Sequence, residues 1–362
     1  MKTLCIDLRW IDASGVGVYI KGIMPGIVER LSDVSIVGLG DATRIEEFPW
    51  SRSANLRLID CKAGRYSIAE QIQLPLAIPS ETDLFFSPYY TIPLFFRGKI
   101  AVTVHDLAHL TLPEIISDRK KYLYAKMMFR AVRKRASTIF TVSDFTKNEL
   151  LRLTKGRRSD NIISIHLGVA PEWREAAELP AIRPKPYFIC VGNVKPNKNI
   201  SRLVRAFQNV QHAIPHDLVI VGQKEGMLTG ESKEFFDQIR AAGPRVEMTG
   251  SVPQADLLSL VGHADALIMP SLYEGFGLPP LEAMAAGVPA VVSRAASLPE
   301  VCGDAALYFD PLGEDEISER LLQIAQEPAL RVQLRESGLR QSAHYSWEAC
   351  SEKTASRLLE SL

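Results

Sequence analysis

Short apolar runs alternate with amphipathic segments along almost the whole chain. The apolar runs are rich in β-branched and aromatic residues, as buried strands are, and the segments between them carry apolar residues three or four positions apart, as helices do. Because strands that alternate with helices form parallel sheets, the pattern predicts an α/β protein with doubly wound, Rossmann-like sheets. The predicted strands are residues 3–8, 34–38, 84–87, 100–104, 138–142 and 162–166, and then 187–191, 217–221, 245–249, 266–269 and 290–293.

The alternation breaks at residues 171–187, where the sequence PEWREAAELPAIRPKPY is rich in proline and charge. Such a stretch is typical of a boundary, and a chain of 362 residues is long enough for two domains of common size. We therefore predict a first domain over 1–172, a second over 173–345 and a terminal helix within 346–362. Doubly wound sheets bind ligands at the carboxyl ends of their strands, so a shared site is expected in the cleft between the two domains.

Two glutamates stand eight positions apart in PSLYEGFGLPPLEAMAAGVP, residues 270–289. Glu274 lies in a glycine-rich loop after a predicted strand. Pro279 and Pro280 suit the first turn of a helix, where a missing N–H group has no partner in any case, so Glu282 falls one turn inside that helix. A helix N-terminus carries a partial positive charge and suits a phosphate. The stretch therefore indicates a sugar-nucleotide site, and the alternative is a loop whose acids merely cap a helix.

A lysine-rich loop follows another predicted strand in VGNVKPNKN, residues 191–199. Lys195 and Lys198 stand at the carboxyl end of that strand, where cations would neutralise a diphosphate. The alternative is a pair of solvated loop lysines.

A glycine pair follows the first predicted strand. Gly15 and Gly17 nearly match the G-x-G-x-x-G loop of NAD-binding proteins, but Ile20 occupies the place of the third glycine. The glycines also begin about six residues after the strand instead of directly on it. A phosphate loop, an NAD site and a plain turn all stay open for this segment.

A histidine and an aspartate end the predicted strand 100–104 in the sequence AVTVHDLAHL. A single histidine is commonly structural. At the carboxyl end of a parallel strand, with Asp106 next to it, His105 is also a candidate for contact with a substrate.

The glutamate pair and the Lys198 loop resemble the E-x7-E signature and the donor loop of retaining family 4 glycosyltransferases, which have the GT-B architecture. The likeness extends over nearly the whole chain. It implies that Glu274 lies beside the donor sugar, that Glu282 holds the nucleotide ribose and that Lys198 binds the diphosphate. It places His105 against the donor sugar and the reacting centre. One position departs from the family, since many relatives carry Arg where this chain has Asn193.

The resemblance also implies the two Rossmann-like domains of the GT-B fold, a C-terminal helix that crosses back to the first domain, and three sets of residues. The catalytic set is Glu274, His105 and Lys198. The donor-binding set is Gly15, Gly17, Asn193, Lys195, Lys198, Ser251, Val252, Gly275, Phe276, Gly277, Leu278 and Glu282. The acceptor-binding set is Arg9, Tyr19 and Asp106. No metal or cofactor is expected beside the donor, because cations and a helix end would stabilise the leaving diphosphate and the chain has no Asp-x-Asp pair.

The amino-acid composition indicates the kind of protein and its expected location in the cell. An apolar content of 46 % and a charged content of 23 % are ordinary for a soluble globular protein, and no run approaches the roughly 18 apolar residues of a membrane span. The five cysteines are scattered without metal-like spacing, as in reduced proteins. The first residues turn acidic and strand-like too early for a signal peptide, so a cytoplasmic location is expected.

The net charge of zero conceals an asymmetry, because residues 1–172 carry 24 basic against 18 acidic residues and the remainder carries the reverse. Much of the basic excess lies in RKKYLYAKMMFRAVRKR, residues 119–135, which contains no acid. The spacing predicts a helix that packs on the core through its apolar residues and leaves a solvated basic face; the sharper alternative is a face for an anionic membrane or acceptor. The interleaved apolar residues are Tyr122, Leu123, Met127, Met128 and Val132. No nucleic-acid recognition module is evident.

The resemblance implies a retaining hexosyltransferase, and we expect it to move mannose from GDP-mannose to a hydroxyl of a glycan or of a polyprenyl-diphosphate-linked oligosaccharide. The expected setting is the synthesis of bacterial lipopolysaccharide or exopolysaccharide, in the cytoplasm or peripherally on the cytoplasmic face of the inner membrane. The choice of mannose rests on overall likeness to mannosyltransferases of such pathways. The alternatives are a UDP- or dTDP-sugar-dependent transferase of the same fold, an NAD-dependent oxidoreductase, a sugar-nucleotide epimerase and a sugar-nucleotide-binding subunit without activity.

Overall fold

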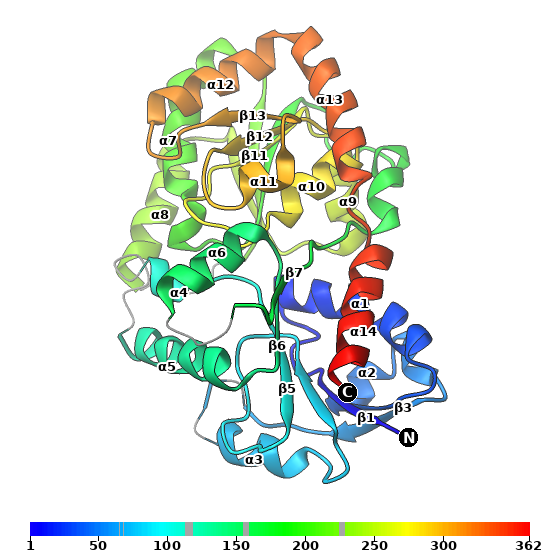
Figure 1. The fold of residues 1–362 in the computed structure, drawn as a ribbon. Helices are drawn as coiled ribbons and strands as arrows, with labels where there is room; N and C mark the ends of the chain where they lie inside the picture. Colours follow the sequence, from blue (N-terminus) through cyan, green and yellow to red (C-terminus); the bar gives the residue numbers. More distant parts are fainter. Residues whose placement is uncertain (65, 68, 113–118, 155–158, 224–228) are drawn as a thin grey trace. The chain divides into compact units, whose positions relative to one another are not determined.

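The chain folds into two compact α/β units in a computed structural model, which describes residues 1–362 except 65, 68, 113–118, 155–158 and 224–228 (Figure 1). The first unit consists of the described residues up to 168 together with 346–362, and the second consists of the described residues of 169–345. Each unit is built on one parallel sheet with helices on its faces.

The sheet of the first unit has the strand order β3-β2-β1-β4-β5-β6-β7, and every pairing in it is parallel. Its strands are β1 Thr3–Asp7, β2 Ser35–Gly40, β3 Leu56–Asp60, β4 Leu84–Ser87, β5 Lys99–Val104, β6 Thr138–Thr141 and β7 Ile162–Ser164. Its helices are α1 Ser14–Arg30, α2 Ala42–Ile45, α3 Glu70–Ala77, α4 Ala108–Thr111, α5 Arg119–Arg135 and α6 Asp144–Leu153, with a 3₁₀ turn η1 at Pro49–Arg52. The chain runs outward from β1 to β3 and returns to β4 on the other side, so the strand order reverses between β1 and β4.

The sheet of the second unit has the strand order β10-β9-β8-β11-β12-β13 and is also parallel. Its strands are β8 Tyr187–Val191, β9 Asp217–Val221, β10 Val246–Gly250, β11 Ala266–Met269, β12 Ala290–Ser293 and β13 Ala306–Phe309. Its helices are α7 Ile200–Val210, α8 Thr229–Ala241, α9 Gln254–Gly262, α10 Leu278–Ala285, α11 Leu298–Cys302, α12 Glu314–Gln326 and α13 Pro328–Ser342. Its 3₁₀ turns are η2 Pro171–Glu178, η3 Pro196–Lys198 and η4 Gln211–Ala213. Here the strand order reverses between β8 and β11.

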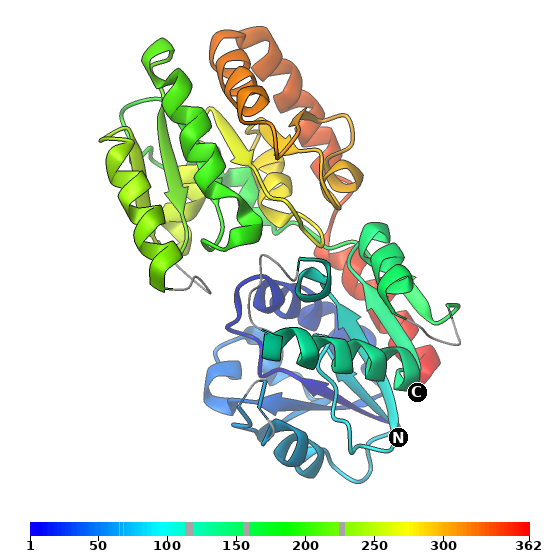
Figure 2. The same cartoon turned by 90° about the vertical axis from the view of Figure 1, so that its left-hand side faces the viewer.

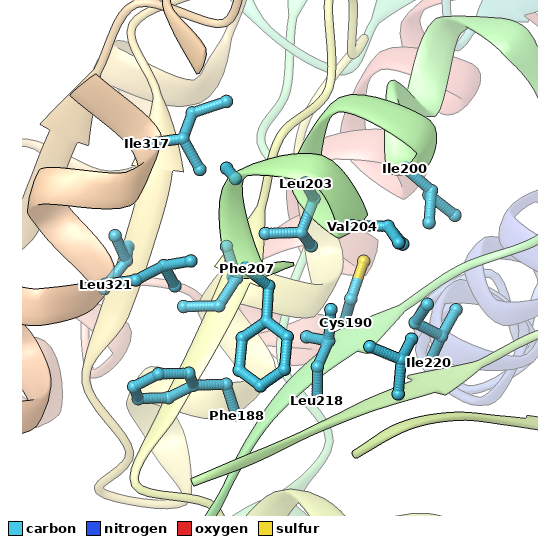
Figure 3. Packing of buried hydrophobic residues seen from close by; sticks show 14 of the residues in the cluster. Phe188, Cys190, Ile200, Leu203, Val204, Phe207, Leu218, Ile220, Ile317 and Leu321 are labelled. Atoms are coloured by element: carbon cyan, nitrogen blue, oxygen red, sulfur yellow. The ribbon is translucent and has the colours of Figure 1, made fainter. Parts of the chain in front are cut away.

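The core of the second unit shows why α7 forms. Its apolar residues recur three and four positions apart, so one face of the helix is continuously apolar. Figure 3 shows Leu203 and Phe207 of that face against Phe188 of β8 and Leu218 of β9, with Ile317 of α12 beside them. Helices α7, α8 and α12 lie on this side of the sheet, and α10 packs against α13 on the other (Figure 2).

A last helix, α14, spans Trp347–Ser361 and packs along α1 within the first unit (Figure 1). Gly22 and Gly26 make this approach possible, because a Cβ atom on Gly22 would collide with the Trp347 ring and one on Gly26 would collide with Ser351. The terminal helix and the pair of parallel sheets confirm the predicted fold class.

Two strands escaped prediction, β3 and β13, and both are edge strands. Each is only partly buried, so neither shows the continuous apolar run of a central strand. The proline- and charge-rich stretch after residue 170 has the composition of a domain boundary, yet it begins with η2, which packs against α9 and α10.

The basic segment forms the expected helix, α5, but its contacts differ from the expectation. The side chains that face the core include Ala125, Met128 and Val132, which recur along one side of the helix. Leu123 and Met127 belong to another side, and they stay 62 % and 45 % exposed. The interpretation of these two residues as core contacts was therefore wrong.

Candidate active site

The loops that follow β8 and β11 leave the second sheet side by side, because these strands are parallel neighbours. They are also the strands between which the strand order reverses. Open α/β sheets bind ligands at such a switch point, outside the carboxyl ends of the strands. The predicted residues Lys198 and Glu274 lie on these two loops.

Lys198 and Glu274 form an ion pair, with 2.6 Å between Lys198 Nζ and Glu274 Oε1. The lysine side chain is 19 % exposed and the glutamate side chain 13 %, so the pair is largely removed from water and still within reach of a ligand. A diphosphate would compete with Glu274 for the ammonium group, because phosphate oxygens are strong acceptors of charge-assisted hydrogen bonds. Release of the lysine would leave the carboxylate available to hydroxyl groups of the same ligand.

Two asparagines connect the loops. The backbone carbonyl of Asn197 accepts the N–H of Leu272 at 2.8 Å, and its Nδ2 donates to the Tyr273 carbonyl at 3.2 Å. Asn199 Nδ2 donates to the Pro270 carbonyl at 3.0 Å. Asn199 has a φ of 56°, a left-handed conformation in which asparagine is several-fold enriched among non-glycine residues. Sequence reasoning missed both residues, although asparagines in a strand-to-helix loop were a usable signal.

Ser297 holds the Glu274 loop from the other side. Its buried hydroxyl lies 2.9 Å from the carbonyl of Glu274 and 2.8 Å from that of Phe276, and it donates to them. These carbonyls lie on either side of Gly275, so one hydroxyl fixes the backbone beside the carboxylate. Sequence reasoning missed Ser297, because no local motif marks a serine 23 residues from the loop that it supports.

The start of α10 requires a glycine. Gly277 precedes the helix with a φ of 110°, and a Cβ atom there would lie 2.7 Å from Leu298 Cδ2. Pro279 and Pro280 occupy the first turn, as predicted. They carry no N–H groups, so of the first three helical residues only Leu278 has a backbone donor. An anion at this end of the helix therefore depends on the backbone of 275–278 and on the helix dipole.

Glu282 lies one turn inside α10, as predicted, and is partly buried. Burial and the nearby carboxylate of Glu172 on η2 raise the pKa of Glu282 to about 7, and the Trp173 side chain opposes that rise. Near neutral pH the group can therefore exchange between a carboxyl and a carboxylate. The η2 segment, which the sequence marked only as a boundary, thus adds to the effect of burial on the pKa of Glu282, a residue predicted to bind the donor.

The remaining predicted donor residues border the same edge of the sheet. Asn193 Oδ1 accepts the N–H of Gln223 at 3.3 Å, so this side chain connects the loops after β8 and β9. Lys195 precedes η3 and is partly buried. Ser251 and Val252 follow β10, the first exposed and the second partly buried.

Comparison with known proteins defines what this site belongs to. Residues 171–341 match the family model of the glycosyl transferases group 1. O-antigen chain mannosyltransferase B of Escherichia coli is 35 % identical over 286 residues, which are 75 % of this chain and 72 % of that protein. The chain belongs to the group 1 glycosyltransferases.

Two further likenesses agree with this family. Serotype-specific mannosyltransferase WbdA of Escherichia coli is 27 % identical over 357 residues, which are 92 % of this chain but only 43 % of that protein. The crystal structure of HepE from Anabaena in complex with UDP-glucose has a TM-score of 0.78 at 15 % identity, with both chains covered over their full length. The protein is thus a GT-B glycosyltransferase of a family of retaining hexosyltransferases, which replaces the oxidoreductase and epimerase alternatives.

The first unit of this glycosyltransferase carries the other predicted residues. His105 directly follows β5, and its Nε2 lies 2.9 Å from the Pro88 carbonyl after β4. Burial lowers the pKa of His105, so the ring is neutral at pH 7. A carbonyl can only accept, so Nε2 carries the proton and Nδ1 is left as the acceptor. The Tyr19 ring lies edge-on against the imidazole at 4.9 Å between centroids and fixes its orientation.

Gly15 and Gly17 lie in the first turn of α1 and not in a loop before it, which corrects the sequence interpretation. The helix begins at Ser14, directly after the short segment that follows β1. Gly17 is needed for packing, because a Cβ atom there would collide with the backbone carbonyl of Ile11. Gly15 has open space around its Cα atom, so its backbone is accessible.

The three predicted acceptor residues are engaged within the first unit. Asp106 Oδ1 accepts the N–H of Ala108 at 3.0 Å and so supports the start of α4. The Tyr19 hydroxyl lies 3.0 Å from Thr103 Oγ1 in the core. The Arg9 side chain is 3 % exposed and forms ion pairs with Asp7 and Glu70. Direct contact with an acceptor would require these groups to exchange the bonds that they already make.

The described residues contain no group of three or more His, Cys, Asp or Glu side chains that could hold a metal ion. No helix in this part of the chain has the length and apolar character needed to cross a membrane.

Proposed function

We propose that this glycosyltransferase transfers mannose from GDP-mannose, with retention, to a hydroxyl of a glycan or polyprenyl-diphosphate-linked oligosaccharide in bacterial surface polysaccharide synthesis. The observation that carries the proposal is the Lys198–Glu274 pair at the switch point of the second sheet, which offers one cation and one carboxylate to the same ligand. The sugar is inferred from the relatives, which are named as O-antigen and serotype-specific mannosyltransferases.

In the proposed reaction, Lys198 leaves Glu274 and binds the diphosphate of the donor. The backbone of 275–278 and the dipole of α10 add stabilisation where negative charge develops as the bond between the sugar and the phosphate breaks. The acceptor oxygen attacks the same face of the sugar, and its proton passes to the leaving phosphate oxygen, so no protein base is required. Glu274 accepts sugar hydroxyls and Glu282 accepts ribose hydroxyls. The cationic groups make a metal ion unnecessary in this scheme.

A UDP-hexose is the competing donor, because HepE, which has a closely similar fold, was crystallised with UDP-glucose. The discriminating experiment is a thermal-shift panel of GDP-mannose, UDP-glucose, UDP-GlcNAc, dTDP-rhamnose and NAD. A ligand at about 100 times its dissociation constant stabilises the folded state by about 2.7 kcal/mol. We expect a shift with GDP-mannose alone. A shift with a UDP- or dTDP-sugar instead would show that this sugar nucleotide, and not GDP-mannose, is the donor. The assignment as a glycosyltransferase would stand.

The exposed side of α5 supports a place at a membrane surface. Basic residues occur at both ends of this side, and two apolar residues lie between them, as in helices that rest on anionic bilayers. The exposed residues are Arg119, Lys120, Leu123, Met127, Arg130 and Lys134. We propose that this side of α5 contacts the anionic lipids that surround a lipid-linked acceptor.

The membrane proposal is tested by sedimentation with vesicles of phosphatidylglycerol and phosphatidylcholine. The double variant Arg130→Glu/Lys134→Glu should lose binding to the anionic vesicles, and Leu123→Ser/Met127→Ser should weaken it. Neither variant should change binding of the sugar nucleotide, because the helix lies in the other unit. Unchanged sedimentation of both variants would remove α5 from the proposal, as would equal binding of the native protein to vesicles of phosphatidylcholine alone.

A further inference from the structure

Three aromatic rings cluster at the carboxyl edge of the first sheet, next to His105. The ring centroids of Trp10 and Tyr89 lie 4.2 Å apart, and those of Trp10 and Tyr66 lie 5.3 Å apart. The hydroxyls of Tyr66 and Tyr89 are 2.5 Å from each other. Tyr89 is also roughly parallel to the His105 ring at 6.3 Å. The cluster thus continues directly from the histidine that is predicted to lie at the reacting centre.

The cluster presents an aromatic surface to solvent. Trp10 is buried beneath it, Tyr89 is partly buried and Tyr66 is 45 % exposed. Tyr66 has a φ of 58°, a left-handed conformation that is unfavourable for an aromatic residue. Backbone strain of this kind persists where the surroundings enforce it, and it concentrates at ligand sites.

Arg9 enforces this conformation through a buried network. Its Nη1 donates to the Ala63 carbonyl at 3.0 Å, and its Nη2 donates to Glu70 Oε1 at 2.8 Å. The other oxygen of Glu70 accepts the N–H of Tyr66 at 2.9 Å. Arg9 therefore binds Ala63 directly and Tyr66 through Glu70, and Asp7 holds Arg9 in place through Oδ1 at 2.9 Å and Oδ2 at 2.7 Å.

The charges of this network favour a neutral ligand. Two carboxylates, Asp7 and Glu70, face the single guanidinium of Arg9, so the described ionic groups beneath the rings carry no excess of positive charge. A phosphate would find no free cation in this network. A sugar ring suits it better, because the apolar C–H face of a pyranose packs on an aromatic ring while the tyrosine hydroxyls can bond to sugar hydroxyls.

We propose that Tyr66, Tyr89 and Trp10 form a platform in which Tyr66, the exposed ring, packs against a neutral pyranose of the acceptor glycan next to His105, while Tyr89 and the buried Trp10 support it, and that Arg9 is the positioning residue of this subsite. The inference rests on the proposed glycosyl transfer and specifies its acceptor side. It replaces direct acceptor contact by Arg9 with an action through Glu70 and the Tyr66 turn.

The test is direct binding of octyl glycosides of mannose, glucose, galactose, N-acetylglucosamine and rhamnose, followed by saturation-transfer NMR. We expect saturation of ring protons in at least one glycoside, and Tyr66→Ala should weaken its binding about tenfold. Tyr66→Phe keeps the ring and should retain most of the affinity. The matched control is Phe95→Ala, because Phe95 is an exposed aromatic residue of the same unit, 71 % accessible, outside the cluster.

The role of Arg9 is tested with Arg9→Lys, which retains charge but loses the planar fork. The variant should weaken glycoside binding as Tyr66→Ala does, and it should leave the thermal shift by GDP-mannose unchanged. If the variant lost binding of the glycoside and of GDP-mannose to the same extent, the fold would be disrupted in general, which would contradict a positioning role for Arg9.

Two results would overturn the platform: no binding of any of the five glycosides to the native protein, or unchanged binding by Tyr66→Ala. Preference for octyl phosphate over every glycoside would point to the lipid diphosphate and also contradict the proposal. Failure of GDP-mannose as donor, with glycoside binding intact, would remove the proposed function and leave the platform in place.

Discussion

The two units present their predicted residues in opposite ways. In the second unit, Lys198 and Glu274 contact each other on neighbouring loops, with their charges still accessible. In the first unit, Arg9, Tyr19 and Asp106 are engaged in supporting their own surroundings. A diphosphate needs cations and backbone donors, so we expect short motifs to mark the residues that bind it. An acceptor imposes no such constraint, and its surface must be found in the folded structure.

The largest effect on activity is expected from the removal of Lys198, which would test the contrast between the two units. We expect Lys198→Ala to lower kcat/KM about a thousandfold, because the leaving diphosphate loses a preorganised charge. Glu274→Gln should cause a loss of similar order while the thermal midpoint stays near the native value. Lys185→Ala is the matched control, an exposed lysine of the same unit that should retain full turnover. Near-normal turnover of Lys198→Ala would show that the site assignment is wrong.

Donor binding should depend on pH through Glu282. The carboxylate is the form that accepts ribose hydroxyls, and its pKa of about 7 means that protons compete with the donor as the pH falls. The donor dissociation constant should therefore rise about tenfold between pH 8 and pH 6. Glu172→Gln removes the neighbouring charge that raises this pKa, so the inflection should move to lower pH.

Glu175→Gln serves as the control for that shift, because Glu175 is an exposed acid on the same η2 turn. Calorimetric titration at each pH supplies the dissociation constants. A dissociation constant that does not change with pH in the native enzyme would show that Glu282 does not bind the donor. An inflection at the same pH in Glu172→Gln would show that Glu172 does not raise the pKa of Glu282.

The smallest expected effect concerns the support of the Glu274 loop. Ser297→Ala removes the hydroxyl that bonds to the Glu274 and Phe276 carbonyls and leaves both carbonyls without it. We expect a loss of about 1–3 kcal/mol in the free energy of unfolding, as for unsatisfied buried groups. The kcat/KM should fall only severalfold, since the carboxylate remains. Chemical denaturation and steady-state kinetics measure the two quantities, and unchanged stability would contradict the assigned bonds.

The interior strands of each sheet could be predicted from the sequence, whereas one edge strand of each sheet could not. The predicted bounds of β4, β8, β9, β11 and β12 match the structure residue for residue, because central strands are buried on both faces and appear as continuous apolar runs. The edge strands β3 and β13 lack that signal. Gly15 and Gly17 were expected in a loop, because glycine has a low intrinsic helix propensity. Tertiary packing overrides that propensity, and both residues lie in α1.

For the candidate site, the charged residues could be predicted from the sequence, but the residues that support or perturb the site could not. Lys198, Glu274 and Glu282 follow strands or prolines in recognisable patterns. Ser297 and Tyr66 act through contacts with residues far from any motif, so only the folded chain reveals them. Glu172 was hidden for a different reason, since its effect on Glu282 passes through space from a segment that resembled a linker.

The packing of α14 on α1 has a consequence for the order of assembly on the ribosome. The glycines that admit this helix lie near the start of the chain, at Gly22 and Gly26, while Trp347 and Ser351 are translated more than three hundred residues later. The second unit can therefore complete its sheet while the first unit still lacks α14. The second unit is thus expected to complete its fold before the first, although the first begins to emerge earlier.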